Sequence, residues 1–172
     1  MRKVVLIGYM GSGKSIISKK LSQKLQISSV ELDEEIEEKS KISIENLFSN
    51  KGELYFRKLE HKLFLELLSK NENLIVSTGG GTPCYFNNHE LLNGKEVVSI
   101  YLKASIDTLI NRLVHERQKR PLIANLEDNE LKEFIAKHLF DRSFYYNQAT
   151  YKVSVDDKSI DEIVDEILEL LA

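Results

Sequence analysis

The sequence predicts an α/β fold of three layers, with helices on both faces of a parallel sheet of about five strands. Short apolar runs alternate along the chain with segments of helical periodicity, which is the pattern of a parallel sheet with crossover helices. The chain has 172 residues, of which 42% are hydrophobic and 30% charged. A chain of this size and composition can bury a substantial core, so we expect one domain over residues 1–172.

Five segments have the composition of strands. The first is a continuous apolar run, typical of a strand that is buried on both faces. The last alternates apolar and polar residues, as an outer strand does. The expected strands are Lys3 to Ile7, Ser28 to Leu32, Asn73 to Ser77, Val97 to Leu102 and Tyr151 to Val155.

Helical periodicity separates these strands, and a capping box of Ser159 and Glu162 precedes the last helix. The first helix should turn one apolar face inward, made of Ile16, Ile17, Leu21 and Leu25. The segment from Gln118 to Asn129 is polar, contains Pro121 and lacks helical periodicity, so we expect a mobile loop there. The expected helices are Ser15 to Leu25, Glu34 to Lys39, Ile44 to Phe48, Glu53 to Ser69, Ile106 to His115, Glu130 to Tyr146 and the segment after Ser159.

Charge and cysteine content exclude several classes of protein. The formal net charge of −3 gives no basic field that would attract nucleic acid or a membrane surface. A single cysteine, Cys84, excludes an internal disulfide and a cysteine-based metal cluster, and is typical of a reducing compartment. The apolar run near the start is too short for a signal peptide or a membrane span. We therefore expect a cytoplasmic protein with small-molecule partners.

The loop after the first expected strand carries the strongest chemical signal. Residues 8–15, GYMGSGKS, match the pattern G-x-x-x-x-G-K-[ST] and lie between a strand and a helix, as that pattern requires. The N–H groups of a glycine-rich loop can converge on phosphates because no side chains obstruct the approach. The lysine then contacts the β and γ phosphates, and the serine hydroxyl can bind Mg²⁺. The motif predicts a nucleotide triphosphate site.

A nucleotide site leaves the reaction open. The N-K-x-D and D-x-x-G motifs of GTP switches are absent, and the third expected strand runs into STGGG (77–81) where large ATPases end in aspartate. Three glycines at the carboxyl end of a parallel strand lie where α/β proteins bind ligands, and bare backbone there lets a small polar molecule approach. A flexible link is the alternative interpretation. The short chain favours a stand-alone kinase.

These motifs occur with others in an order that resembles the shikimate kinase family over nearly the whole chain. The ordered set is far more specific than any single member. It comprises residues 8–15, Leu32-Asp33 with Ile36-Glu37, Ser43-Ile44 with Phe48, Gly52-Glu53 with Phe56-Arg57 and Glu60, Thr78 to Gly81, Lys119 to Leu122, and Arg142 with Tyr145. The resemblance implies a P-loop NTPase-like fold, and we expect the chain to be a monomer. It also implies ATP-dependent phosphorylation of the 3-hydroxyl of shikimate, on the route to chorismate and the aromatic amino acids.

The resemblance further implies roles for single residues, with Arg57 and Arg142 holding the carboxylate and Asp33 contacting the attacking hydroxyl. Arg120 lies on a lid at about 116–129, and Arg112 lies beside adenine. The shikimate-binding set is Asp33, Arg57, Gly79, Gly80, Gly81 and Arg142, in part on a helical substrate-binding segment at about 33–60. The ATP-binding set is Gly11, Ser12, Gly13, Lys14, Ser15, Ile16, Arg112 and Arg120. The catalytic set is Lys14, Asp33 and Arg120.

Metal binding departs from the family pattern. The family commonly has Asp-x-Asp at the end of the second strand, where the first aspartate helps to hold Mg²⁺ through water. In this sequence the pair is Glu31 and Asp33, and a spacing of two puts both side chains on one face of a strand. We expect Ser15 to bind Mg²⁺ and Glu31 to act on it through water.

Without the resemblance, several of these residues have ordinary interpretations. Arg57 with Glu60 would be an exposed helical ion pair, and Asp33 would be a helix N-cap. Arg120 would be a solvated loop residue. The four histidines (61, 89, 115 and 138) have no ligand spacing, and we interpret them as ordinary surface or helix positions.

Two other functions stay open at this point. One is another P-loop kinase of nucleotides or small molecules, although the D-G-x-P-R segment of nucleoside monophosphate kinases is absent and a gluconate-type kinase would lack the glycines at 79–81. The other is a kinase fold retained as a non-catalytic binding module. Intact Lys14, Ser15 and Asp33 argue against that second alternative.

Overall fold

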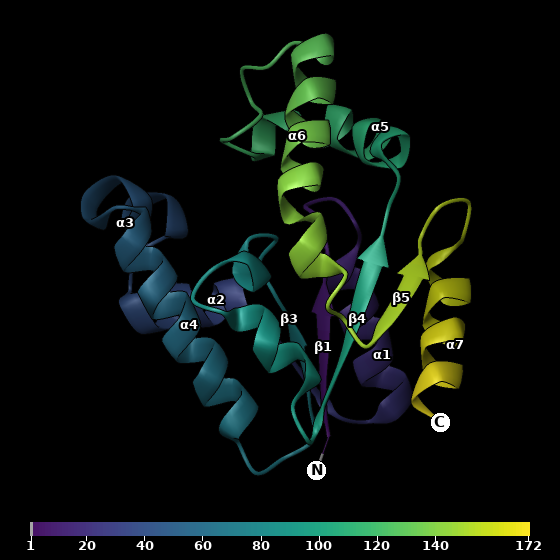
Figure 1. The fold of residues 1–172 in the computed structure, drawn as a ribbon. Coiled ribbons are helices and arrows are strands. Elements are labelled where there is room, and N and C mark those ends of the chain that lie inside the picture. Colours follow the sequence, from purple (N-terminus) through teal and green to yellow (C-terminus); the bar gives the residue numbers. More distant parts are fainter. Residues whose placement is uncertain (1) are drawn as a thin grey trace.

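The computed structural model describes residues 2–172, and its centre is a five-stranded sheet with the strand order β2-β3-β1-β4-β5 (Figure 1). All neighbouring strands pair in parallel. The strands are β1 (Lys3–Ile7), β2 (Ser28–Glu31), β3 (Leu74–Ser77), β4 (Val97–Lys103) and β5 (Tyr151–Ser154). The predicted parallel sheet and the outer position of its last strand are both confirmed.

The register brings the carboxyl ends of three strands to one edge of the sheet. Ser77 at the end of β3 pairs with Leu6 of β1 and with Glu31 at the end of β2. Loops that leave parallel strands at such an edge are the usual ligand site of α/β proteins. The P-loop after β1, the acidic residues at the end of β2 and the glycines after β3 therefore meet at one place.

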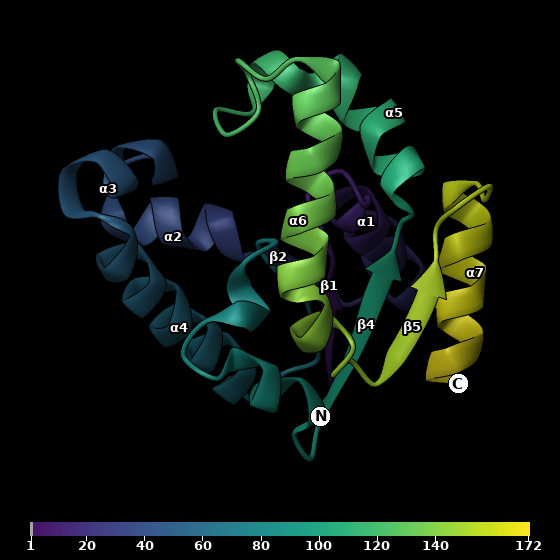
Figure 2. The ribbon, with the colours of Figure 1, turned by 45° about the horizontal axis from the view of Figure 1, so that its top comes forward.

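Helices cover both faces of the sheet, as Figures 1 and 2 show: α1 and α7 lie on one face, and η2 with the C-terminal half of α6 lies on the other. The three predicted layers are confirmed. No helix within residues 2–172 is long and apolar enough to cross a membrane. The helices are α1 (Lys14–Leu25), α2 (Leu32–Ser40), α3 (Ile44–Lys51), α4 (Glu53–Ser69), α5 (Ile106–Glu116), α6 (Asp128–Tyr146) and α7 (Ile160–Leu171), with 3₁₀ turns η1 (Thr82–Cys84), η2 (Asn88–Asn93) and η3 (Arg117–Lys119).

The central strand β1 is fully enclosed. Its residues 4–7 are at most 2% exposed, and β3 and β4 flank it on either side. Burial of each aliphatic side chain of this size contributes about 1.5–3 kcal/mol to folding. The strand that carries the P-loop is therefore held rigidly, which fixes the position of the phosphate-binding backbone.

One prediction and one alternative interpretation of residues near helix starts are wrong. Ile16 is 48% exposed, whereas Ile17 and Leu21 in the same helix are 0% exposed. The first turn of α1 projects beyond the sheet edge, where no core covers it, so Ile16 lines the cavity described below. Asp33 is not an N-cap, because α2 begins at Leu32, two residues before the expected start at Glu34, and Glu31 occupies the cap position.

The segment predicted as a loop, residues 118–129, consists mostly of turns, and contacts with the rest of the protein hold it in place. Ile123 within it is 0% exposed. At its base the Arg117 guanidinium donates to the carbonyl oxygen of Leu126 at 2.8 Å and pairs with Asp128, which joins the two ends of the segment. The helix after it begins at Asp128 rather than at residue 130, because a capping box that starts at Glu127 stabilises an earlier start.

Candidate active site

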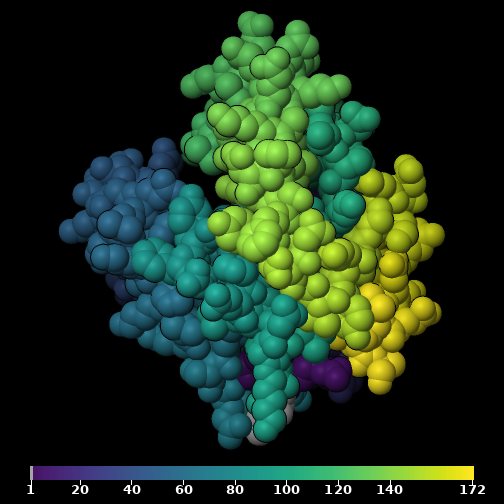
Figure 3. Space-filling view, viewed as in Figure 1, coloured from purple at the N-terminus to yellow at the C-terminus, as the bar shows by residue number. Residues whose placement is uncertain are grey.

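A cavity of about 780 Å³ opens at the carboxyl edge of the sheet. The P-loop and the first turn of α1 form its floor, and the ends of β2 and β3, the end of α5, Arg120 and the start of α7 form its walls. Figure 3 shows the segment after α5 and helix α6 (green) standing above the rest of the molecule, with a recess between them and α3 (blue). The cavity gathers residues from most of the chain into one polar site.

Three glycines of the P-loop have positive φ, and a Cβ at the first of them, Gly8, would lie 2.9 Å from the carbonyl oxygen of Leu102. Gly11 has φ 82° and Gly13, the N-cap of α1, has φ 96°, and both values are costly for residues with a Cβ. Lys14 is half-buried, and its Nζ donates to the carbonyl oxygens of Gly8 at 2.8 Å and Tyr9 at 3.0 Å. Burial lowers the pKa of Lys14 to about 8. The loop, the lysine and the N-terminus of α1 together form a site for phosphate.

Ser15 lies beside Glu31, and the Ser15 hydroxyl donates to Glu31 Oε2 at 3.0 Å. The predicted pair for magnesium is thus close together, one residue on α1 and the other at the end of β2. Within residues 2–172 no group of three or more His, Cys, Asp or Glu side chains could hold a metal ion by itself. The two oxygen donors suit a hard cation that takes its other ligands from phosphate and water.

The glycines after β3 allow three functional side chains to approach one strip of backbone. A Cβ added at Gly79 would lie 3.1 Å from Asp33 Oδ1, and one at Gly80 would lie 3.0 Å from Arg142 Nη1. A Cβ at Gly81 would lie 2.6 Å from Arg57 Nη2. The structure therefore brings together the candidate substrate residues from α2, α4 and α6. A Cβ at Gly81 would collide with the Arg57 guanidinium, and one at Gly79 or Gly80 would be tightly packed.

Arg57 and Glu60 form a buried pair, which contradicts the interpretation as an exposed helical ion pair. Arg57 Nη1 donates to Glu60 Oε1 at 2.9 Å, and Glu60 is 0% exposed. The other carboxylate oxygen of Glu60 accepts from Thr82 Oγ1 at 2.8 Å. A buried ion pair gives little net stability but fixes geometry strongly, so the pair holds the guanidinium in one orientation beside the glycine strip.

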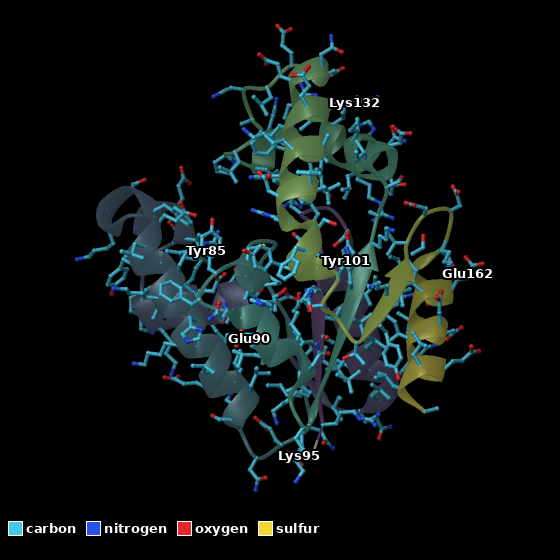
Figure 4. All side chains as sticks on the ribbon, in the orientation of Figure 1. Tyr85, Glu90, Lys95, Tyr101, Lys132 and Glu162 are labelled. Atoms are coloured by element: carbon cyan, nitrogen blue, oxygen red, sulfur yellow. The ribbon has the colours of Figure 1, made fainter. Side chains whose placement is uncertain are left out.

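Tyr85 is a residue of the site that sequence reasoning missed. Its ring lies 4.1 Å from Arg57 Cζ, and its hydroxyl donates to Glu53 Oε1 at 3.0 Å. Figure 4 shows Tyr85 between α4 and α6, on the rim of the recess. No motif signals this role, because the contact joins the turn after η1 to a helix far earlier in the chain.

Asp33 lines the cavity. Solvent in the cavity reaches its carboxylate, although the cavity walls surround it. Desolvation by these walls raises the pKa of Asp33 to about 6, and the negative charges of Glu60 and Glu31 add to the rise against the opposing effect of Lys14. A carboxylate with a pKa near neutrality is suited to accept a proton at physiological pH. Asp33 is therefore well placed for acid–base chemistry.

The remaining predicted arginines both line the cavity. Arg120 donates to Glu116 Oε2 from Nε at 3.2 Å and from Nη2 at 2.8 Å, so it is paired rather than solvated. Arg112 Nη1 donates to the carbonyl oxygen of Gly11 at 3.0 Å, against the P-loop. Lys158, Ser159 and Ile160 also line the cavity, and sequence reasoning recognised only the capping role of Ser159.

Comparison with known proteins identifies the family. The family model described as shikimate kinase matches residues 10–172. A shikimate kinase of Flavobacterium johnsoniae is 61% identical over 172 residues, covering 100% of both chains. The crystal structure of shikimate kinase from Bacteroides thetaiotaomicron has a TM-score of 0.92 at 36% identity and covers 99% of this chain and 98% of its own.

A second solved structure shows the ligand class in this family. Shikimate kinase from Acinetobacter baumannii in complex with shikimate has a TM-score of 0.88 at 27% identity, covering 99% of this chain and 93% of its own. Matches of this length and identity confirm the resemblance that the motifs indicate. The chain belongs to the shikimate kinase family.

Proposed function

We propose that this chain transfers the γ-phosphoryl group of ATP to the 3-hydroxyl of shikimate, giving 3-phosphoshikimate on the route to chorismate and the aromatic amino acids. The observation that carries this proposal is that the P-loop, Gly79 and Gly80 line one cavity, while Arg142 and Arg57 lie against Gly80 and Gly81 beside it. The P-loop suits a triphosphate, and paired arginines suit a small carboxylate. Membership of the family and a 61% identical shikimate kinase support the same reaction.

The test is ADP release in a coupled assay with Mg²⁺ and ATP. We expect release to be far faster with shikimate than with buffer, and far faster than with gluconate or a nucleoside monophosphate at the same concentration. An equal rate with buffer would refute the proposed reaction. A faster rate with another acceptor would assign the chain a different substrate on the same fold.

At the ATP end, the phosphates lie on the N–H groups of residues 11–16, and Lys14 Nζ leaves its two carbonyl partners for the β and γ phosphates. Arg112 and Ile16 line the nucleotide half of the cavity. Arg120 leaves Glu116 and contacts the γ-phosphoryl group, where its positive charge offsets the negative charge of the transition state.

At the shikimate end, Arg57 and Arg142 hold the carboxylate and the strip at residues 79–81 provides close backbone approach. Asp33 accepts the proton of the 3-hydroxyl or holds that hydroxyl in line. Transfer breaks the bond between the β–γ bridging oxygen and the γ phosphorus, and forms a bond from that phosphorus to the 3-oxygen of shikimate. Lys14 and Arg120 stabilise the charge on the phosphoryl group as it moves.

Magnesium fits the donors present. Ser15 would supply a hydroxyl ligand, and the Glu31 carboxylate beside it would accept a hydrogen bond from a metal-bound water. When bound, the ion neutralises part of the charge of the triphosphate. The chain's own contribution is to hold both oxygens at the edge of the P-loop.

A change at Glu31 tests this arrangement. Glu31→Gln is expected to raise the Mg²⁺ concentration for half-maximal rate roughly tenfold, as the loss of an outer partner of a metal does. Glu31→Asp should be mild because it keeps the charge, and neither change should alter shikimate affinity. An unchanged magnesium dependence would make Glu31 only a residue at the end of a strand.

Changes at the two arginines test carboxylate binding. Arg57→Lys and Arg142→Lys keep the charge but lose the planar fork, so shikimate affinity should fall by about 1.5–3 kcal/mol, or roughly 10–150-fold. ATP affinity without shikimate should change little. Arg2→Lys, at an exposed arginine outside the site, is the matched control. Equal losses of ATP and shikimate affinity would contradict the assignment.

We assign the segment at about 116–129 as a lid over ATP, within a single domain that also holds the substrate-binding segment at about 33–60. Hydrogen exchange in residues 118–129 should slow when Mg²⁺–ADP and shikimate are both added, while exchange in α7 stays as it was. Equal protection with and without ligands would mark the segment as a fixed loop.

The proposal keeps two expectations from the sequence. The first is a cytoplasmic location, which the single cysteine favours. The second is a monomer, which light scattering on the purified chain would test directly.

A further inference from the structure

Tyr9 occupies a position that the P-loop motif leaves open to any residue, yet it is only 1% exposed. Its hydroxyl lies 3.0 Å from Nδ1 of His138, on α6. Burial raises the pKa of Tyr9 to about 12 and lowers the pKa of His138 from its ordinary value of 6.5. At neutral pH the tyrosine is therefore protonated and the imidazole uncharged, so Tyr9 can donate to Nδ1.

His138 belongs to one face of α6 that contacts both halves of the site. His138, Arg142 and Tyr146 follow at intervals of four, so they lie along one face of the helix. Arg142 Cζ lies 5.6 Å from the centre of the Tyr9 ring, and the Tyr146 hydroxyl donates to the Gly80 carbonyl oxygen at 2.6 Å. This face joins the P-loop to the glycine strip.

Tyr9 also connects these contacts to the phosphate-binding lysine. Its carbonyl oxygen accepts from Lys14 Nζ at 3.0 Å, while its ring and hydroxyl contact α6. The same helix begins at Asp128, at the end of the proposed lid. A change at the nucleotide phosphates therefore has a short covalent and hydrogen-bonded path to Arg142.

We propose that the Tyr9–His138 hydrogen bond couples the nucleotide site to the shikimate site by holding Arg142 on α6 in register with the P-loop. Tyr9 and His138 are positioning residues, since neither is assigned a contact with a substrate. The inference rests on the proposed function, because it takes Arg142 as a carboxylate ligand. Its observable consequence is that bound nucleotide raises the affinity for shikimate, and that this gain depends on the hydrogen bond.

The experiment measures shikimate binding by calorimetry with and without saturating Mg²⁺–ADP. The variants are Tyr9→Phe, which keeps the ring, His138→Leu, and the two combined. His138→Asn keeps a hydrogen-bonding group close to the place of Nδ1 and should rescue. Tyr101→Phe is the matched control, because Tyr101 is also buried and none of the hydrogen bonds found within residues 2–172 involves its hydroxyl; Figure 4 labels it on β4.

We expect nucleotide to strengthen shikimate binding in the unmodified chain, and Tyr9→Phe to reduce that strengthening by about three- to tenfold, as the loss of one hydrogen bond does. ADP affinity alone should stay within about twofold. The double variant should lose no more than either single variant, because both remove the same bond. His138→Asn and Tyr101→Phe should keep most of the coupling.

Coupling that is absent from the unmodified chain, or that survives in full in Tyr9→Phe, would overturn the inference. A loss of ADP affinity in Tyr9→Phe equal to the loss of coupling would also overturn it, because Tyr9 would then act only on the P-loop. None of these outcomes would contradict turnover of shikimate by the unmodified chain. Absence of turnover would instead refute the proposed function, and the inference with it.

Discussion

Lys14→Ala is expected to lower kcat/KM by at least about 150-fold, equivalent to about 3 kcal/mol of transition-state stabilisation. The lysine is half-buried in the P-loop, where its charge is poorly screened by water and meets the charge of the transferring group. Steady-state rates with shikimate and ATP both varied measure the loss. Thermal unfolding of the same samples shows whether the fold is kept.

Lys24→Ala is the matched control, since Lys24 lies on the same helix and pairs with Asp165 at the surface, at 2.6 Å. An exposed pair of this kind contributes little to stability, and its loss should leave the rate unchanged. If Lys14→Ala retained more than about a tenth of the activity, other residues would have to stabilise the charge of the transferring phosphoryl group.

Asp33→Asn should lower kcat/KM by roughly 10²–10⁴-fold if the carboxylate takes the proton of the hydroxyl. Because the pKa of Asp33 is raised to about 6, the rate of the unmodified chain should fall as the pH drops through that value and the carboxylate is protonated. The lowered pKa of Lys14, about 8, predicts a second fall as the pH rises through it. The variant should lose the acid limb and keep the alkaline one.

Comparison of the two pH profiles isolates Asp33, because titration of ATP and shikimate affects both proteins equally. Glu34→Gln, an exposed neighbour on α2, is the control and should keep the acid limb. An Asn variant that retains the acid limb, with less than a tenfold loss of rate, would show that Asp33 only holds the hydroxyl in line.

The parts of the site that depend on local spacing were predictable from the sequence. Lys14 and Ser15 follow from the P-loop motif, and the sheet follows from short apolar runs. The burial of Arg57 and Glu60 did not follow, because spacing shows only that two side chains share a helix face. Which way that face turns is decided by the contact of α4 with the glycine strip.

Other features depend on contacts between distant segments or on helix ends. Only the family resemblance predicts that Arg142 and Arg57 bind the same carboxylate, because no sequence pattern relates α4 to α6. The inward position predicted for Ile16 failed because an apolar pattern predicts burial only where core lies beneath the helix. Tyr9 fills a variable position of its motif, so its partner became visible only in three dimensions.

The central position of β1 has a consequence for how the chain is made. Strand β1 is synthesised before both of its neighbours, β3 and β4, so Lys3 must wait for Leu74 on one side and Val97 on the other. Until those segments have been synthesised, residues 4–7 are an apolar stretch with no strand to pair with. Such non-local pairing slows folding and leaves nascent chains prone to association. The phosphate-binding loop therefore gains its final shape only after β3 and β4 have been translated, although it precedes both of them in the chain.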